Sequence, residues 1–147
     1  MDHYEHTQPG TLILVSLLLV LALIGYLYLV TPAGHIATGL LFLVLAAAAF
    51  IFHSLTVRVT DAEVIVSFGP GVIRKTFPLA DIVTARAVRN PWYFGWGIRV
   101  IPGGWMFNVS GLSAVELERF SGRKFRIGTD DPDGLLRAIR AARGLPG

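Results

Sequence analysis

The chain contains no cysteine, and no charged residue occurs between Glu5 and Arg58. The absence of cysteine excludes disulfide scaffolds, thiol catalysis and zinc–thiolate sites. Of the 147 residues, 53% are hydrophobic and only 16% are charged, which excludes disorder as the main state because disordered chains are poor in apolar residues. The uneven distribution predicts a membrane-embedded N-terminal part and a soluble C-terminal part that is long enough to bury a small core.

Two apolar runs lie within the uncharged stretch. Residues 11–30 would span roughly 30 Å as a helix, the thickness of the hydrocarbon core, and residues 36–52 are at the short end for a span. The turn signal Thr-Pro-Ala-Gly separates them. We therefore expect a cytoplasmic tail over 1–10, a transmembrane helical hairpin over 11–53 and a folded domain over 54–147. A cleaved signal peptide is the alternative, but it requires a cationic start and a shorter apolar run.

Lysine and arginine are absent from the first 57 residues, so all 13 lie at or after Arg58. The positive-inside rule then places the C-terminal part in the cytoplasm, and two spans return the N-terminus to the same side. The expected location is a cell (inner) membrane, crossed twice. No charge lies within either span, which removes the main support for a channel or transporter. Small residues could pack the two helices together or form an oligomer face: Gly25, Gly39 and 46–49.

After residue 54 the hydrophobic pattern changes to a period of two. Short alternating segments separated by Gly and Pro predict an antiparallel sandwich or barrel. The predicted strands are 55–60, 64–68, 72–77, 82–88, 98–101, 105–109, 115–118 and 124–127. The predicted core includes Val57, Val66, Ile82, Ile98, Leu117, Ile127 and Ile139.

The last predicted hairpin can be placed in register. If Gly122 takes the left-handed position of a three-residue loop, apolar residues face each other on one side and charged residues on the other. Glu116 then faces Arg126, and Glu118 faces Lys124. This arrangement predicts that the two glutamates lie on a solvated, charge-paired strand face and are not a catalytic carboxylate pair.

The chain is predicted to end in a helix. Asp131 is a suitable N-cap, Pro132 suits the first helical position and Gly144 suits the end. One apolar stripe would cover an open edge of the sheet; its members are Leu135, Leu136, Ile139 and Ala142.

A bent antiparallel sheet closed by a C-terminal amphipathic helix is the plan of pleckstrin-homology (PH) domains. The sequence resembles bacterial PH-like domain proteins, and the likeness rests on segments 64–69, 74–82, 90–99 and 126–132. The resemblance implies an α+β membrane protein in which a two-helix transmembrane hairpin precedes a PH-like β-sandwich or barrel capped by a C-terminal helix. It carries no catalytic residues. The first hairpin turn of the predicted domain, 60–63, contains Asp61 and Glu63. The corresponding turn is basic in PH domains that bind phosphoinositides, so no specific phosphoinositide recognition is expected.

The segment 89–96, hereafter the aromatic segment, is the candidate membrane-interface or partner-binding site. If the strands alternate direction as a meander, it returns to the membrane side with turns 69–71 and 110–112. Trp and Tyr favour the headgroup zone, and Arg is attracted to anionic lipid. The alternative is that the rings complete the core, with the two Trp pointing inward. The candidate residues are Arg89, Trp92, Tyr93, Phe94 and Trp96.

Other chemistry has little support in the sequence. His3 and His6, with Asp2 and Glu5, are too sparse for a metal site, so no metal and no cofactor are expected. The basic residues are dispersed, which argues against nucleic-acid binding. The Gly-x-Gly at 95–97 does not open a helix. Ser110 and Ser113 have no histidine within the domain to activate them as nucleophiles.

These observations predict a non-enzymatic protein whose domain acts as a scaffold, binds a protein partner or self-associates at the cytoplasmic membrane face. Two alternatives remain open. One is a peripheral module that senses anionic lipid; the other is an accessory subunit of a membrane complex that uses the helices as its contact.

Overall fold

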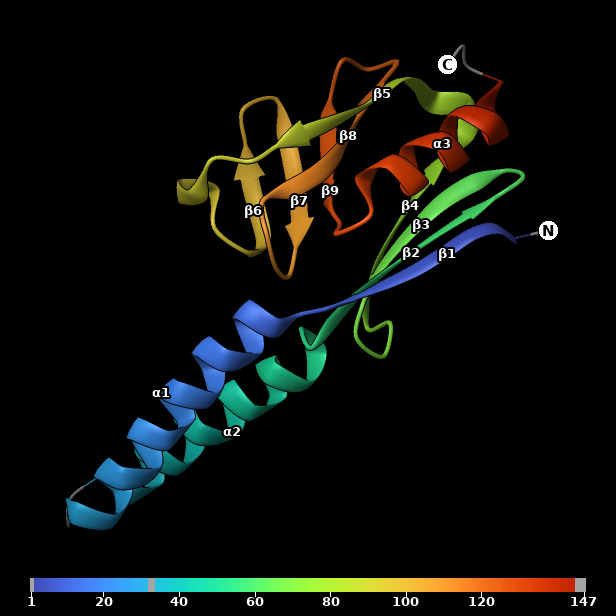
Figure 1. Cartoon of the computed structure of the whole chain (residues 1–147). Coiled ribbons are helices and arrows are strands. Elements are labelled where there is room, and N and C mark those ends of the chain that lie inside the picture. Colours follow the sequence, from blue (N-terminus) through green and yellow to red (C-terminus); the bar gives the residue numbers. More distant parts are fainter. Residues whose placement is uncertain (1, 32–33, 145–147) are drawn as a thin grey trace.

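The chain is an α+β protein, described by a computed structural model over residues 2–31 and 34–144 (Figure 1). Its helices are α1 (Thr11–Val30), α2 (His35–Ile51) and α3 (Pro132–Arg143). Its strands are β1 (Asp2–Pro9), β2 (Ser54–Thr60), β3 (Glu63–Phe68), β4 (Ile73–Pro78), β5 (Ile82–Arg89), β6 (Gly97–Ile101), β7 (Gly104–Asn108), β8 (Ser113–Arg119) and β9 (Lys124–Gly128). Two short 3-10 helices, η1 (Leu79–Asp81) and η2 (Trp92–Phe94), flank β5.

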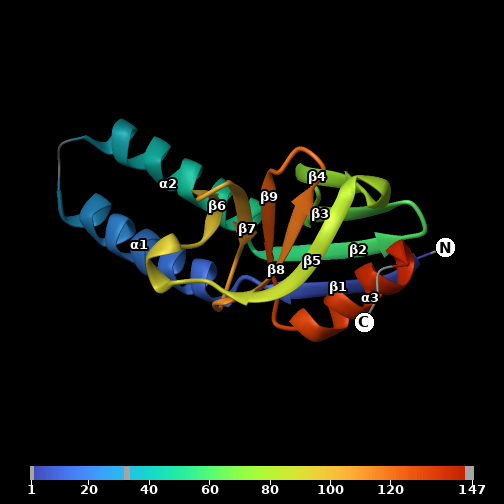
Figure 2. The same cartoon turned by 90° about the horizontal axis from the view of Figure 1, so that it is seen from above.

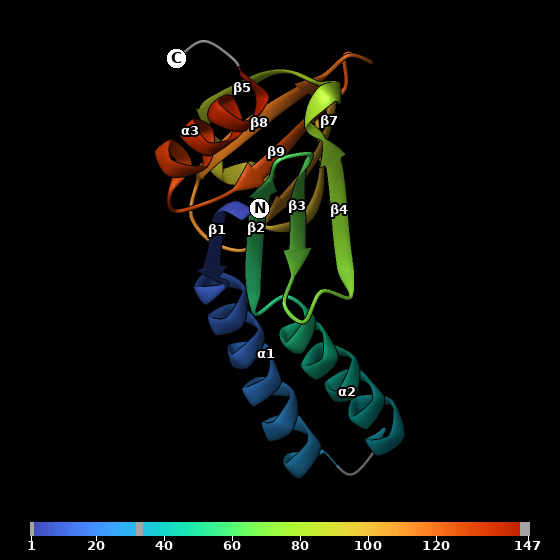
Figure 3. The ribbon, with the colours of Figure 1, turned by 90° about the vertical axis from the view of Figure 1, so that its right-hand side faces the viewer.

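Helices α1 and α2 run side by side away from the β domain (Figures 1 and 3). By length and composition α1 is apolar enough to cross a membrane, and most of its side chains are exposed, whereas Ile24 is buried. The shorter α2 is also apolar. Seen from above, the helices diverge toward their far ends (Figure 2), and no atom lies within 4 Å of a Cβ added to Gly25 or Gly39. The two glycines therefore do not bring the helix backbones together.

Strand β1 was not predicted from the sequence. Residues 1–10 were expected to be a tail, but Asp2–Pro9 pairs antiparallel with β2, with Pro9 opposite Ser54 and Thr7 opposite Thr56. The segment is polar, so it lacks the apolar alternation that marks a strand, and β2 supplies its hydrogen-bonding partner. The β domain therefore includes a strand on the N-terminal side of α1.

The strands form two sheets. The four-stranded sheet has the order β1-β2-β3-β4 and is antiparallel; the five-stranded sheet has the order β5-β8-β9-β7-β6. Each of the strands expected after residue 54 is present. The expectation of a purely antiparallel meander was wrong, because β7 pairs with β9 in parallel. The β6–β7 hairpin lies on the far side of β9 from β5 and β8.

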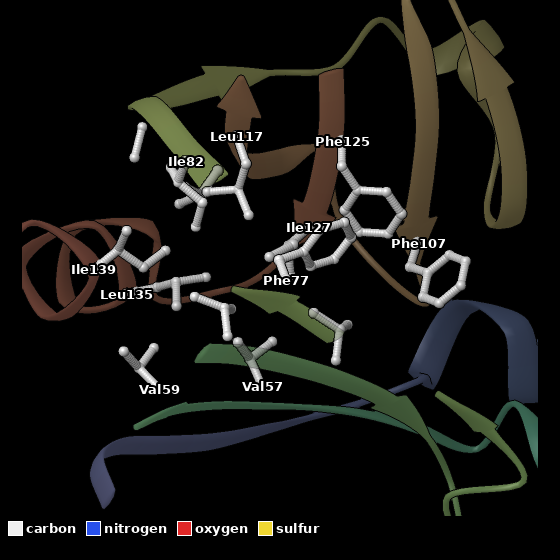
Figure 4. Packing of buried hydrophobic residues seen from close by; sticks show 14 of the residues in the cluster. Val57, Val59, Phe77, Ile82, Phe107, Leu117, Phe125, Ile127, Leu135 and Ile139 are labelled. Carbon is white, nitrogen blue, oxygen red and sulfur yellow. The ribbon is translucent and has the colours of Figure 1, made fainter. Parts of the chain in front are cut away.

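The core lies between the two sheets and α3 (Figure 4). The predicted core residues are buried, with one exception. Ile98 is 37% exposed because β6 is the edge strand of its sheet. Aromatic rings fill the centre: Phe77 and Phe125 lie 4.5 Å apart between centroids, and Phe107 lies 5.1 Å from Phe125.

The C-terminal helix is confirmed. Asp131 caps α3 by accepting a hydrogen bond from the Gly134 amide at 3.0 Å, and Gly144 ends the helix with a φ of 70°. Leu135 and Ile139 are fully buried against the sheets. The Tyr4 hydroxyl donates to Asp131 Oδ2 at 3.0 Å, so α3 is also attached to β1.

The predicted register of the β8–β9 hairpin is confirmed, with Glu116 opposite Arg126 and Glu118 opposite Lys124. The expected solvation of Glu116 was wrong. Its side chain is only 3% exposed and lies 2.5 Å from Arg86 and 2.7 Å from Arg126, with Lys124 at 3.8 Å. Three cations compensate the burial of one carboxylate.

Candidate functional site

The helices join the β domain through very short connections. Gly10 alone separates β1 from α1, and Phe52 and His53 separate α2 from β2. The Gly10 amide donates to the His53 carbonyl oxygen at 2.7 Å, which holds the two connections together. A Cβ on Gly10 would lie 2.6 Å from the Phe52 carbonyl oxygen, so only glycine fits this approach. The helix pair is thus fixed to the sheet with little freedom to swivel.

The turns predicted to return toward the helices do lie at that end of the domain. A Cβ added to Gly69 would contact backbone oxygens of Phe50 and Ile51 at the end of α2. Gln8, three residues before the start of α1, donates through Nε2 to the Ser110 carbonyl oxygen at 3.1 Å. Figures 1 and 2 both show the yellow segment between β5 and β6 on the side from which the helices leave. The meander that motivated this placement continues only through β4, but these turns lie at the end of the domain from which the helices leave.

The aromatic segment presents two rings to the surroundings. Trp92 is 74% exposed and Tyr93 is 68% exposed, so these two do not complete the core. Phe94 and Trp96 are half-buried. The guanidinium carbon of Arg126 lies 5.5 Å from the Phe94 ring centroid, and Trp96 Nε1 donates to the Gly111 carbonyl oxygen at 2.9 Å. The alternative interpretation, in which both tryptophans point inward, does not fit Trp92, which points outward.

A polar network that the sequence did not reveal positions this segment. The backbone N–H of the buried Asn90 donates to the Leu112 carbonyl oxygen at 2.7 Å. Arg126 donates to Asn90 Oδ1 at 2.9 Å and to Glu116 Oε2 at 2.7 Å. The facing of Glu116 and Arg126 was visible in the sequence, but Asn90 offered no signal. The aromatic segment is therefore held by an ion pair in the interior of the domain.

The charged groups of this network stabilise the fold and do not form a site for proton transfer. Burial raises the pKa of Glu116, but hydrogen bonds from Arg126 and Arg86 outweigh it, and the pKa lies below its usual range. Glu116 is therefore ionised at neutral pH and is a poor proton acceptor.

A groove of about 340 Å³ separates the aromatic segment from the helices. Leu12, Ile13 and Leu17 of α1 line one wall, and Trp96 and Arg99 line the other. Arg99 is held by a hydrogen bond from its Nε to the Trp96 carbonyl oxygen at 2.8 Å. The groove thus combines an apolar wall with one cation, and Arg89 is exposed at the end of β5 nearby in sequence.

The N-terminal histidines are committed to separate partners. His3 bonds Asp61, and His6 bonds Asp130 at 2.5 Å. Glu5 pairs with Arg58 at 3.0 Å, and the side chain of Asp2 lies outside the described residues. Within 2–31 and 34–144, no three His, Cys, Asp or Glu side chains gather in a way that could hold a metal ion.

Comparisons with known proteins returned no relative for this architecture. No protein-family model, curated protein or solved structure matches the chain.

Proposed function

We propose that the chain is a membrane-anchored, non-enzymatic protein whose PH-like domain acts as a scaffold or partner-binding module at the cytoplasmic face of a bacterial inner membrane. The observation that carries the proposal is the position of the helix pair. It is inserted between β1 and β2, which are neighbours in one sheet.

Strand pairing constrains the number of membrane crossings. Strands β1 and β2 are paired along their length, from Pro9 opposite Ser54 to Asp2 opposite Thr60. Both strands must therefore lie on the same side of a membrane. If α1 crosses, α2 must cross back. The 17 residues of α2 give a length of about 26 Å, which suits a thin or locally thinned bilayer. The β1–β2 pairing therefore supports the two-helix hairpin, and the positive-inside rule supports a cytoplasmic domain with both termini inside.

The strand order supports the PH-like assignment. Two insertions account for its unusual features: the α1–α2 hairpin between β1 and β2, and the β6–β7 hairpin between β5 and β8. When both are set aside, β1-β2-β3-β4 and β5-β8-β9 remain, followed by α3. This arrangement corresponds to the seven-stranded PH plan with its C-terminal helix. The resemblance carries no catalytic residues, which agrees with the structural use of Glu116.

Cysteine labelling tests the proposed topology, and the cysteine-free chain is a natural background for it. Thr31→Cys places a thiol at the far end of α1, and Ser121→Cys places one in the β8–β9 turn. We expect a membrane-impermeant maleimide to label Thr31→Cys in intact spheroplasts, and Ser121→Cys only after permeabilisation. The reverse pattern would show the opposite orientation. Labelling of neither site before lysis, together with extraction by alkaline carbonate, would show that the chain is not inserted.

Lipid contact by the aromatic segment is a second candidate function. It is favoured by the exposure of Trp92 and Tyr93 beside the helix pair and by the groove that Arg99 shares with α1. Aromatic side chains of this kind partition into the headgroup zone. The segment would then fix the tilt of the domain on the bilayer and sense anionic lipid.

A further inference from the structure

The five-stranded sheet is wider than the four-stranded sheet that covers it. One row of residues crosses its inner face through paired positions, from β6 to β5: Val100, Trp105, Phe125, Leu117 and Ala85. Their exposed fractions are 73%, 52%, 4%, 0% and 5%. In the next row, Ile98 is 37% exposed and its partner Phe107 is 6% exposed. The β6 and β7 end of the face is therefore uncovered, and we call Ile98, Val100 and Trp105 the uncovered patch.

The covering sheet ends at β4. Among the described strands, β4 pairs with β3 alone, so its outer edge presents free backbone groups. Figure 3 shows β4 at the outer edge of its sheet. On its inner face, Phe77 is buried while Lys75, two residues earlier, is exposed beside the uncovered patch. One further strand on this edge would complete the cover over β6 and β7.

The space beside β4 is a pocket of about 280 Å³ with an aromatic floor and a basic rim. Phe77, Phe107 and Phe125 form the floor. The rim carries Lys75, Arg119, Arg123 and Lys124, and none of the described residues that line the pocket is acidic. Arg119 is paired with Asp81 at 2.6 Å, and Lys124 lies 3.8 Å from Glu116, which already binds two arginines. Within the described residues, neither Lys75 nor Arg123 has a carboxylate within 4.0 Å.

The positive charge around the pocket indicates which kind of partner can bind at the free edge of β4. A single inward lysine is enough to discourage edge-to-edge aggregation, so protection alone does not explain four cations. A second copy pairing through β4 would bring Arg74 and Lys75 of both chains together, which is repulsive. The β8–β9 turn that carries Arg123 lies at the end of the domain away from the helices (Figures 1 and 3), so a lipid headgroup in the anchoring bilayer is remote from it.

We propose that the free edge of β4 receives an extended acidic segment of a different protein, which adds as a fifth strand to the four-stranded sheet. Apolar side chains of the segment cover the uncovered patch, and its carboxylates meet Lys75 and Arg123. Main-chain hydrogen bonds to β4 supply affinity, and the pocket supplies specificity. The inference rests on the proposed partner-binding function and names the chemistry of the partner.

A defined probe tests this site on the full-length chain in phosphatidylcholine nanodiscs. The probe is a fluorescein-labelled seven-residue peptide whose positions 1, 3, 5 and 7, which share one face of a strand, are glutamate, valine, phenylalanine and glutamate, and whose other positions are threonine. Binding is followed by fluorescence anisotropy. We expect saturable binding, and about tenfold weaker binding when lysine replaces every glutamate. Two further peptides carry N-methyl groups on alternate sets of backbone nitrogens. Because only one set faces β4 in an added strand, one methylated peptide should lose binding and the other should retain it.

Matched variants locate the site. The double variant Lys75→Glu with Arg123→Glu, and separately Trp105→Ala, should each weaken binding about tenfold. Arg137→Glu, a charge reversal at another exposed position, on α3, should leave the affinity within about twofold. All of these side chains are partly or fully exposed, and far-ultraviolet circular dichroism confirms that each variant is folded.

Three outcomes would overturn the proposal: equal binding of the lysine peptide, equal loss with both methylated peptides, or displacement of the peptide by phosphatidylglycerol added to the nanodisc. The last would show that the pocket takes anionic lipid. Peptide binding does not depend on how the helices cross the bilayer, whereas cysteine labelling reports only that crossing. Failure of the acidic-strand proposal is therefore distinguishable from failure of the proposed anchoring.

Discussion

Glu116 shows how one buried charge organises a distant surface. Its carboxylate binds Arg126, which in turn binds Asn90 and lies over Phe94 in the aromatic segment. The carboxylate also binds Arg86 on β5. A carboxylate so placed is stabilising only while it is ionised, because removal of its charge leaves Arg126 largely buried and unpaired.

We predict that Glu116→Gln destabilises the full chain by about 2–4 kcal/mol at pH 7. The pKa of Glu116 is lowered in the folded state, so its contribution is complete above the unfolded pKa of about 4.3 and is lost as the pH falls through the folded pKa. The difference between the variant and the natural chain should therefore shrink below about pH 4. Urea unfolding in detergent, followed by tryptophan fluorescence, measures both values.

Glu118→Gln is the matched control on the same strand. Glu118 is half-buried, and its bond from Thr84 is long at 3.4 Å. Its replacement should lower the free energy of unfolding by less than about 0.5 kcal/mol. If both variants lost the same free energy of unfolding, the buried ion pairs of Glu116 would contribute no more to stability than the contacts of Glu118.

At the scale of elements, β1 changes the expected extent of the soluble domain. Without residues 2–9, β2 becomes an open edge, and α3 loses the Tyr4 hydroxyl from its N-cap. Open edge strands promote aggregation. Residues 54–147 are therefore an incomplete domain, although they contain all the strands that the sequence predicted.

We predict that residues 2–9 joined to residues 54–147 through an Asn-Gly turn form a soluble, monomeric domain. Pro9 and Ser54 are paired in the β1–β2 ladder, so a two-residue hairpin turn can replace the whole helix pair. Residues 54–147 alone should aggregate or lose several kcal/mol of stability. Size-exclusion chromatography and thermal unfolding compare the two proteins. Equal stability of both would show that β1 is dispensable.

The aromatic segment leads to a prediction about its depth in the bilayer. In a variant with Trp96→Phe and Trp105→Phe, Trp92 is the remaining tryptophan, and bromines placed high on the acyl chains should quench its fluorescence more than deep ones. In the control variant, with Trp92→Phe and Trp96→Phe, Trp105 is the remaining tryptophan. Its fluorescence should respond to aqueous acrylamide but not to brominated lipid. Equal lipid quenching of the two variants would contradict the placement of the segment on the bilayer.

At the scale of the whole molecule, local patterns predicted local structure. Period-two alternation located β2 to β9, facing charges located the β8–β9 register, and Asp131 and Gly144 located the ends of α3. Non-local features were not predictable. The parallel pairing of β7 with β9 and the exposure of Ile98 both depend on which strands become neighbours, and no short segment of sequence encodes this. The polar β1 is recognisable as a strand only once β2 is beside it.

The insertion of the helix pair between β1 and β2 also sets the order of events during biosynthesis. Strand β1 leaves the ribosome first, yet its partner is not made until both apolar helices have been synthesised. The four-stranded sheet can therefore close only after both helices have been made and, in the proposed topology, only after α2 has returned the chain to the starting side. Cleavage by a signal peptidase anywhere between residues 10 and 53 would separate β1 from the sheet it completes. In the proposed topology, completion of the four-stranded sheet thus depends on correct insertion of the helix pair.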